Sequence, residues 1–185
     1  MVKQVLRETE DKMKRSVEAF RKELTGLRAG RASPAILDKV AVDYYGTPTP
    51  VNQLGTVTVP EPRLLVIAPW DKSLIPAISK AIMKSDVGIT PMTDGNVIRL
   101  VVPQLTKERR QELVKGLKKK GEEERVAIRN IRRDAIQEIK ASEKDGKVPE
   151  DESRRGQDEA QKIHDRYMKE IDQAVDAKEK EIMEV

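Results

Sequence analysis

The charged residues of this chain are unevenly distributed, and this distribution limits what the chain can fold into. Residues 30–104 hold 13 of the 68 Asp, Glu, Lys and Arg residues, whereas residues 1–29 and 105–185 hold the other 55. The middle segment also contains nine of the ten prolines, which do not fit helix interiors. The two flanks instead have the apolar periodicity of long helices. We therefore expect one domain, residues 30–104, to be inserted into another that residues 1–29 and 105–185 form together.

Composition limits the cores and the class of protein. Five aromatic residues are present, so aliphatic residues must build the cores, helped by the methylene stems of charged side chains. The absence of cysteine excludes disulfides and thiolate metal ligands and suits a reducing compartment. No stretch approaches the roughly 20 apolar residues of a membrane span, and the charged N-terminus lacks the apolar segment of a signal peptide. We expect a monomeric, cytoplasmic protein that does not enter the membrane.

The first flank has the pattern of a long amphipathic helix. Its apolar residues recur every three, four or seven positions and form one narrow stripe: Leu6, Met13, Val17, Phe20, Leu24 and Leu27. Because glycine accepts the left-handed conformation of a helix end, we expect this helix to stop at Ala29 and Gly30.

The second flank predicts two further helices. One should run from residue 106 to 145, locally weakened by Gly116 and Gly121, and the other should begin at Pro149. Each apolar stripe is too narrow for its helix to stand alone. We therefore expect an elongated antiparallel three-helix bundle with crossing angles near ~20°.

The middle segment has the alternation and turns of a small mixed domain. Strands are expected at residues 40–45, 56–59, 63–68 and 97–102, and a helix after Asp71. On this pattern Tyr44 and Tyr45 point to opposite faces of one strand, so at least one of them should pack inside. The chain is thus expected to be an α+β protein in which a β/α/β domain interrupts a helical bundle.

The most informative cluster is Arg125, Arg129, Arg132 and Arg133. The first three fall within about 60° of helix surface, roughly a quarter turn from the apolar face, where the bundle should not bury them. A solvated basic face is the simpler interpretation. However, residues 107–133 carry eleven Lys or Arg against five Glu, and the four arginines have no acid or lysine between them. Since the guanidinium fork suits phosphate oxygens, a nucleic-acid surface is the sharper hypothesis.

Basic and flexible residues also meet where the two domains are expected to join. Arg28 and Arg31 flank Gly30, and the chain returns through Pro103, Gln104 and Leu105. Arg28 can simply complement a helix dipole. The alternative is a hinge at Gly30 and residues 103–105 with basic groups beside it.

Catalytic and cofactor sites have little support in the sequence. His164, the only histidine, falls near the apolar face of the last helix, where a core or boundary position is the better interpretation. No phosphate-binding glycine loop, dinucleotide motif or metal-ligand spacing occurs. We expect no enzymatic activity, no cofactor, no metal and no small-molecule substrate.

Several segments resemble the ribosome recycling factor family. They are LRAGRASPAILD (27–38), VDYYGTPTPVNQL (42–54), DGNVIRL (94–100), PQLTKERR (103–110) and RVAIRNIRRDA (125–135). The resemblance extends over essentially the whole chain, and its motifs are highly specific. Departures are minor, such as Ala29, where the family often has Thr.

The resemblance implies an L-shaped molecule and a role at the end of translation. In that family the bundle lies on the ribosomal RNA of the large subunit, with the positions of Arg129, Arg132 and Arg133 on the RNA-facing surface. The factor acts with elongation factor G and GTP to split the post-termination ribosome and free messenger RNA. This implies the ribosome and elongation factor G as partners, with the inserted domain as a lever.

Two other classes of function remain open on the residues alone. A helical adaptor would use the bundle to bind another protein and would expose an apolar stripe. A general RNA-binding protein would use the basic face and need no hinge. Deletion of residues 31–104 separates these alternatives, because RNA binding can survive it and subunit splitting should not.

Overall fold

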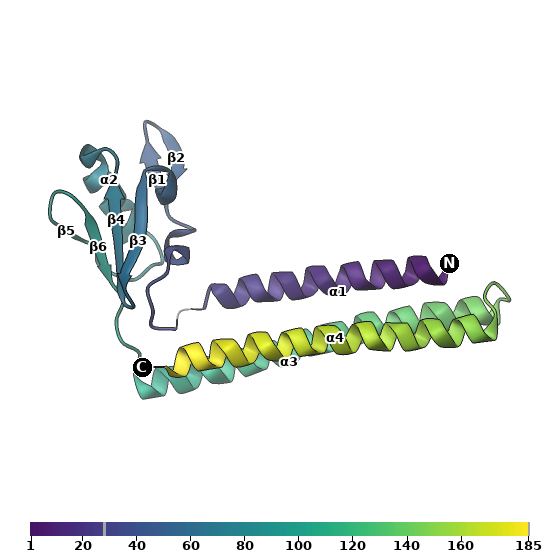
Figure 1. Ribbon diagram of the computed structural model, residues 1–185. Helices are drawn as coiled ribbons and strands as arrows, with labels where there is room; N and C mark the ends of the chain where they lie inside the picture. Colours follow the sequence, from purple (N-terminus) through teal and green to yellow (C-terminus); the bar gives the residue numbers. More distant parts are fainter. Residues whose placement is uncertain (28, 185) are drawn as a thin grey trace. The chain divides into compact units, whose positions relative to one another are not determined.

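The chain divides into two compact units. The computed structural model describes residues 1–27 and 29–184. The helical unit comprises Met1–Leu27 and Lys107–Val185, and the sheet unit comprises Arg28–Thr106. Over the described residues, no helix is both long and apolar enough to cross a membrane. Helices and a small antiparallel sheet occupy separate parts of the chain, which confirms the expected α+β class (Figure 1).

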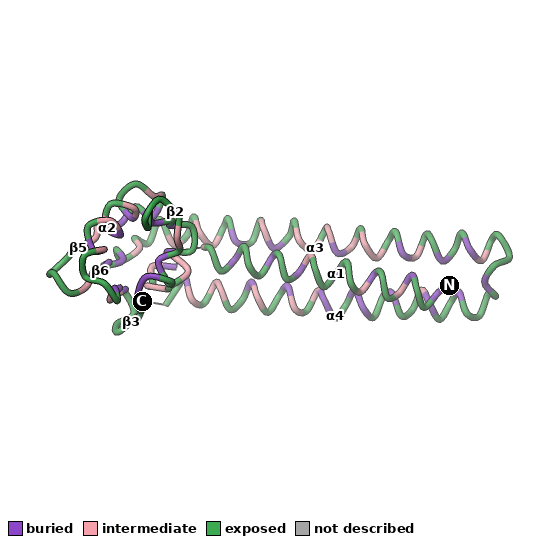
Figure 2. Tube along the Cα trace, turned by 90° about the horizontal axis from the view of Figure 1, so that it is seen from above, coloured by how far each residue is buried: buried purple, intermediate pink, exposed green. Residues whose placement is uncertain are grey.

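The helical unit is a bundle of α1 (Val2–Thr25), α3 (Lys107–Lys144) and α4 (Glu150–Met183), each packed against the other two (Figure 1). A short turn joins α3 to α4, so these two are antiparallel, and α1 runs alongside them. Figure 2 shows buried residues recurring at short intervals along the helices. The buried positions of α3 and α4 include Leu117, Ile128, Ile139, Ile171 and Ile182. These form the narrow apolar seam that the sequence predicts.

The first helix ends earlier than expected. It stops at Thr25 with Gly26 at its C-cap in a right-handed conformation (φ −74°), so the prediction of an end at Ala29 and Gly30 is wrong. Thr25 and Gly26 are both weak helix formers, and two in succession end the helix. Gly30 does adopt a left-handed conformation (φ +76°), but outside any helix. Leu6 and Leu27 are half-buried, while the core positions that the expected stripe omits are Val2, Val5 and Thr9.

The turn between α3 and α4 follows the predicted chemistry. Gly146 has φ +75°, and its N–H donates to the Glu143 carbonyl over 3.0 Å. Pro149 is the N-cap of α4, and the three acids that follow it occupy the first turn. Acidic side chains at a helix N-terminus are favourable because they face the positive end of the helix dipole. Both helix boundaries are therefore confirmed.

Two glycines of α3 differ in what surrounds them. A Cβ built at Gly121 would lie 2.9 Å from Val175 Cγ2 on α4, whereas nothing lies within 4 Å of a Cβ at Gly116. Local weakening of the helix by both glycines stays a prediction, and Gly121 has a packing role beside it. Its missing side chain lets α3 and α4 approach each other.

The sheet unit contains a hairpin, a larger antiparallel sheet and one α-helix. The hairpin pairs β1 (Ala41–Tyr44) with β2 (Thr47–Pro50). The larger sheet has the order β3 (Gly55–Glu61), β4 (Leu64–Pro69), β6 (Ile98–Val101) and β5 (Met92–Thr93). Its connections include α2 (Ile75–Lys84), which is preceded by a 3-10 turn capped by Asp71. The core of this unit includes Val42, Leu65, Ile67, Ile78 and Leu100.

The tyrosine pair is not arranged as the strand alternation predicts. Tyr45 has φ +49° and, with Gly46, forms the two-residue turn between β1 and β2. Tyr44 is 38% exposed and Tyr45 84% exposed, and their rings meet edge to face with centroids 4.6 Å apart. The expectation that one of them packs inside is wrong. Strand β2 was not expected, because its two prolines are tolerated only on an edge strand such as this one.

We expect alanine to have opposite effects at the two glycines of α3. Gly116→Ala should stabilise the protein by about 0.5–1 kcal/mol, because alanine is the better helix former and its methyl group meets nothing. Gly121→Ala gains the same propensity but must displace Val175, at an overpacking cost of about 1–3 kcal/mol. Urea unfolding followed by circular dichroism measures both. Equal stabilisation by the two substitutions would contradict a close approach at Gly121.

Candidate nucleic-acid interface

The arginines predicted to contact a polyanion lie in two parts of the structure. Arg125, Arg129 and Arg132 lie on the flank of α3 that faces α4, while Arg133 lies further outward on the same helix. Arg31 is exposed in the sheet unit. Arg28 lies outside the described residues. The structure therefore brings together the four arginines of α3.

Arg125 is mostly enclosed by the bundle. Its side chain is only 23% exposed, and its Nε and Nη2 atoms lie 2.9 and 2.8 Å from Asp172 Oδ1 on α4. Its Nη1 also lies 3.5 Å from Glu122. The bundle does not bury this arginine fully, in line with the expectation, but it covers more of it than a solvated basic face would have, because the carboxylate on α4 neutralises it. Arg125 is thus a cross-link between two helices.

Arg129 is paired within its own helix. Its Nη1 donates to Glu122 Oε1 over 3.0 Å. This hydrogen bond is the main reason why the pKa of Glu122 is lowered below its ordinary value. The pair is exposed, so its net contribution to stability is small and a phosphate oxygen can take the place of the carboxylate.

The charges of Arg132 and Arg133 are offset less by neighbouring groups than those of Arg125 and Arg129. Arg132 Nη1 donates to the neutral amide oxygen of Gln161 over 3.1 Å. Arg133 is exposed and makes no hydrogen bond or ion pair with any residue that the structure describes. These two side chains are the best placed of the four to bind an anion.

The lysine run at residues 118–120 is partly neutralised. Lys118 lies 3.7 Å from Glu179 on α4, and Lys120 lies 3.1 Å from Glu23 on α1. Net charge along the sequence therefore overstates the positive potential of this end of α3. The acids that offset it come from other helices.

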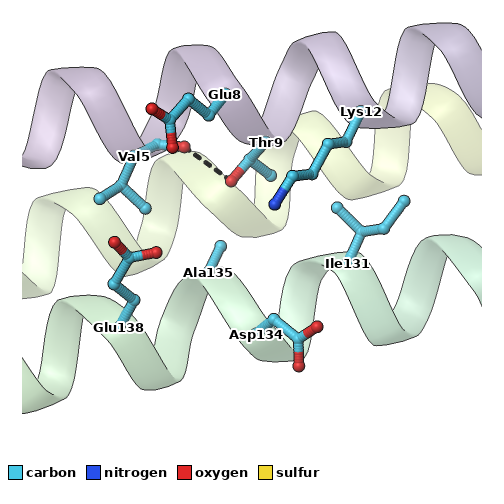
Figure 3. Close-up of a pocket in the computed structure, with 8 residues that line it drawn as sticks. All are labelled: Val5, Glu8, Thr9, Lys12, Ile131, Asp134, Ala135 and Glu138. Carbon is cyan, nitrogen blue, oxygen red and sulfur yellow. Dashed lines mark hydrogen bonds between the residues drawn. The ribbon is translucent and has the colours of Figure 1, made fainter.

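The other flank of α3 is acidic. A small hollow between α1 and α3 is lined by Glu8, Asp134 and Glu138, with Lys12 as its one basic lining residue (Figure 3). The hydroxyl of Thr9 in this hollow already donates to the Val5 carbonyl over 2.7 Å. Carboxylates repel phosphate, so a polyanion is directed to the opposite flank of α3, where the arginines lie. No group of three or more His, Cys, Asp or Glu side chains among the described residues could hold a metal ion.

His164 is buried, as expected, and belongs to a polar cluster on α4. Its Nδ1 lies 2.8 Å from Asp165 Oδ1, which also accepts a 2.9 Å hydrogen bond from Gln161 Nε2. The hydrogen bond from His164, followed by that from Gln161, lowers the pKa of Asp165 below its ordinary value. This cluster adjoins Arg132 through Gln161.

The residues predicted to form a hinge are irregular in conformation. Pro103, Gln104 and Leu105 lie in neither helix nor strand, between β6 and α3. Gly30 has φ +76°, and a Cβ added to it would lie 3.0 Å from Leu105 Cγ. The outgoing and returning segments are thus in contact within the sheet unit.

Sequence reasoning missed the partners of the arginines. Glu122 precedes Arg125 by three residues, a spacing that predicts a helical ion pair. Gln161 and Asp172 have no such signal, because they come from another helix, 29 and 47 residues away from the arginines they contact. Only the register between α3 and α4 brings them together.

We expect Arg125 and Arg133 to differ in their effect on stability. Arg125→Met should lower the free energy of unfolding by about 0.5–1 kcal/mol, because it removes the charged hydrogen bond between α3 and α4, while water can still solvate the exposed Asp172. Arg133→Met should stay within about 0.5 kcal/mol of the unsubstituted protein, because it removes no contact with a described residue. Thermal and urea unfolding measure both variants. Similar destabilisation by the two would contradict the assignment of Arg125 as the cross-link.

Comparison with known proteins gives matches along the whole chain. The family model described as ribosome recycling factor matches residues 20–183. The ribosome-recycling factor of Desulforamulus reducens is 65% identical over 185 residues, covering 100% of both chains. That of Syntrophomonas wolfei is 60% identical with the same coverage.

The chain is also similar to solved structures of ribosome recycling factors. A solution structure of a ribosome recycling factor has a TM-score of 0.82 at 44% identity, covering 100% of this chain and 98% of that one. A second match has a TM-score of 0.68 and 43% identity over 100% of both chains. It shows the T. thermophilus ribosome recycling factor and the E. coli elongation factor G bound to the E. coli post-termination complex.

Proposed function

This chain belongs to the ribosome recycling factor family, and we propose that it binds the post-termination ribosome and, with elongation factor G and GTP, separates it into subunits. Full-length identity of 65% to a ribosome-recycling factor is the observation that carries this proposal. The structural match to a factor seen with elongation factor G on the post-termination complex supports both partners. Messenger RNA would be released at the same step, in the cytoplasm.

The helical unit is the proposed anchor on large-subunit ribosomal RNA. Arg132 and Arg133 would bind phosphate oxygens directly, because neither forms an ion pair with a carboxylate of the described residues. Arg129 would exchange Glu122 for a phosphate. Arg125 would support the surface through its tie to Asp172, and Arg31 would add a contact from the sheet unit. Such contacts depend on salt and recognise the shape of RNA more than its sequence.

The sheet unit is the proposed lever. Elongation factor G would hydrolyse the GTP and push this unit about a hinge at Gly30 and residues 103–105. The chain itself would act as a monomer and carry out no chemistry, so it needs no cofactor or small-molecule substrate. The left-handed conformation of Gly30 and its contact with Leu105 support a hinge of defined geometry.

The first test is light scattering of post-termination ribosomes mixed with the protein, elongation factor G and GTP, with an initiation factor to hold split subunits apart. Scattering should fall only when all components are present. Arg133→Ala should weaken ribosome binding and reduce the slope of log affinity against log salt by about one, with unchanged thermal stability. Ribosome binding without splitting would favour a general RNA-binding protein. Failure to bind ribosomes would overturn the proposal.

Gly30→Ala tests the hinge. Alanine at φ +76° is strained, and its methyl group would press on Leu105, so the splitting rate should fall while ribosome binding persists. Gly95→Ala is the matched control, because Gly95 also has a positive φ (+90°) in the sheet unit but nothing lies within 4 Å of its added Cβ. The control variant should split ribosomes at nearly the normal rate. Equal loss in both variants would point to instability of the sheet unit and away from a hinge.

A further inference from the structure

Gln161 forms hydrogen bonds with two groups of opposite type, a donor and an acceptor. Its Oε1 accepts from Arg132 Nη1 at 3.1 Å, and its Nε2 donates to Asp165 Oδ1 at 2.9 Å. Arginine can only donate, and an ionised carboxylate can only accept. An amide satisfies both with two separate atoms, and the two neighbours fix which end of it faces which. Gln161 is therefore held in one orientation.

The cluster is anchored in the interior of the bundle. Asp165 Oδ1 lies 2.8 Å from Nδ1 of His164, whose side chain is only 9% exposed. Because a carboxylate cannot donate, Nδ1 carries the hydrogen, and the 3.4 Å approach of Gln161 Nε2 to the same nitrogen is not a hydrogen bond. A chain of contacts thus runs from buried His164 through Asp165 and Gln161 to the guanidinium of Arg132.

Arg125, on the same flank of α3, has a carboxylate as its partner and provides a comparison with Arg132. Arg125 is held by the carboxylate of Asp172, which orders its side chain and cancels its charge. Arg132 is held by an amide, which orders the side chain without placing a carboxylate at ion-pair distance, and the charge of Asp165 acts on it only through space. A charged, ordered guanidinium is what binding a phosphate requires, because ordering a long side chain on binding opposes affinity.

We propose that Gln161 is a positioning residue for RNA binding: it holds Arg132 ready for a backbone phosphate without neutralising it. This inference rests on the proposed function of the arginine surface. It concerns a residue of α4 that would not itself contact RNA. The two hydrogen bonds of Gln161, to Arg132 and to Asp165, are the observations that support this role.

The test begins with the free protein. In the unsubstituted protein, ¹⁵N relaxation of the Arg132 Nε–H group should report an ordered side chain, and in Gln161→Met this group should become mobile on the ps–ns timescale. Gln157→Met is the matched control. Gln157 lies one turn earlier on α4 and donates to Ser153 Oγ over 3.1 Å within the same helix. Unchanged Arg132 dynamics in Gln161→Met would overturn the inference whether or not the protein binds ribosomes.

The second measurement is the affinity for purified large ribosomal subunits at several salt concentrations. Gln161→Met should bind about three- to tenfold more weakly, with an unchanged salt slope because Arg132 keeps its charge. Gln161→Glu with Asp165→Asn keeps the net charge, an acceptor for Arg132 and a donor beside it, but moves the carboxylate into direct contact with Arg132, so the slope should fall by about one. In an Arg132→Met background, Gln161→Met should have no further effect.

The outcomes separate the two proposals. If the unsubstituted protein does not bind the subunits, the proposed function fails, and the relaxation data still decide whether Gln161 orders Arg132. If it binds and Gln161→Met equals Gln157→Met, the positioning role is wrong. A loss of affinity that persists in the Arg132→Met background would also overturn it.

Discussion

The narrow apolar seam along α3 is the constraint on which the helical unit depends. Ile128 and Ile139 are fully buried, while the charged residues Arg129, Glu138 and Lys140 lie directly beside them in sequence. In a seam this narrow, charged groups lie at the boundary of the core, lose part of their hydration and need partners. The register of the helices supplies those partners. Ser16 on α1 donates to Glu124 over 2.6 Å, and Asp172 on α4 receives Arg125. Burial nevertheless raises the pKa of Glu124 above its ordinary value, which shows that the boundary position carries a cost.

The same pairing decides which charges remain for a ligand. By sequence, the segment around Arg125–Arg133 is strongly basic, but in the folded protein much of that charge is matched by acids from α1, α3 and α4. In the proposed RNA surface, binding would therefore depend on the arginines whose partners are neutral or exchangeable. Arg132, Arg133 and Arg129 meet this description, and Arg125 does not. The acidic hollow on the opposite flank of α3 makes the helix electrostatically two-sided, which orients a polyanion with no need for high net charge.

Much of the fold could be predicted because it follows from local rules. The limits of α3 and α4, the cap at Asp71 and the burial of His164 depend on periodicity and on residues near in sequence. The end of α1 at Thr25 also follows from local propensity, and the other errors arose where tertiary context decides. Tyr45 forms a hairpin turn because Gly46 and the pairing of β1 with β2 favour it. The packing role of Gly121 could not be predicted either, because Val175 is 54 residues away in sequence. At the candidate site, the arginines could be found from the sequence, but Gln161 and Asp172 could not, since only the packing of α4 on α3 brings them close.

Ion pairs that a phosphate can displace also affect how a ribosome-bound factor dissociates from the ribosome. A phosphate bound by Arg129 would displace Glu122, so the net free energy of that contact would be the difference between two similar ion pairs. An arginine held by an amide would gain more binding free energy from a phosphate, because no carboxylate has to be displaced from it and its guanidinium is already ordered. Most of the binding free energy would then come from a few side chains, chiefly Arg132 and Arg133. The rest of the α3 surface would contribute mainly by its fit to the shape of the RNA. A factor built in this way can bind specifically and still dissociate once its few strong contacts are lost, as a protein that acts on one ribosome after another must do.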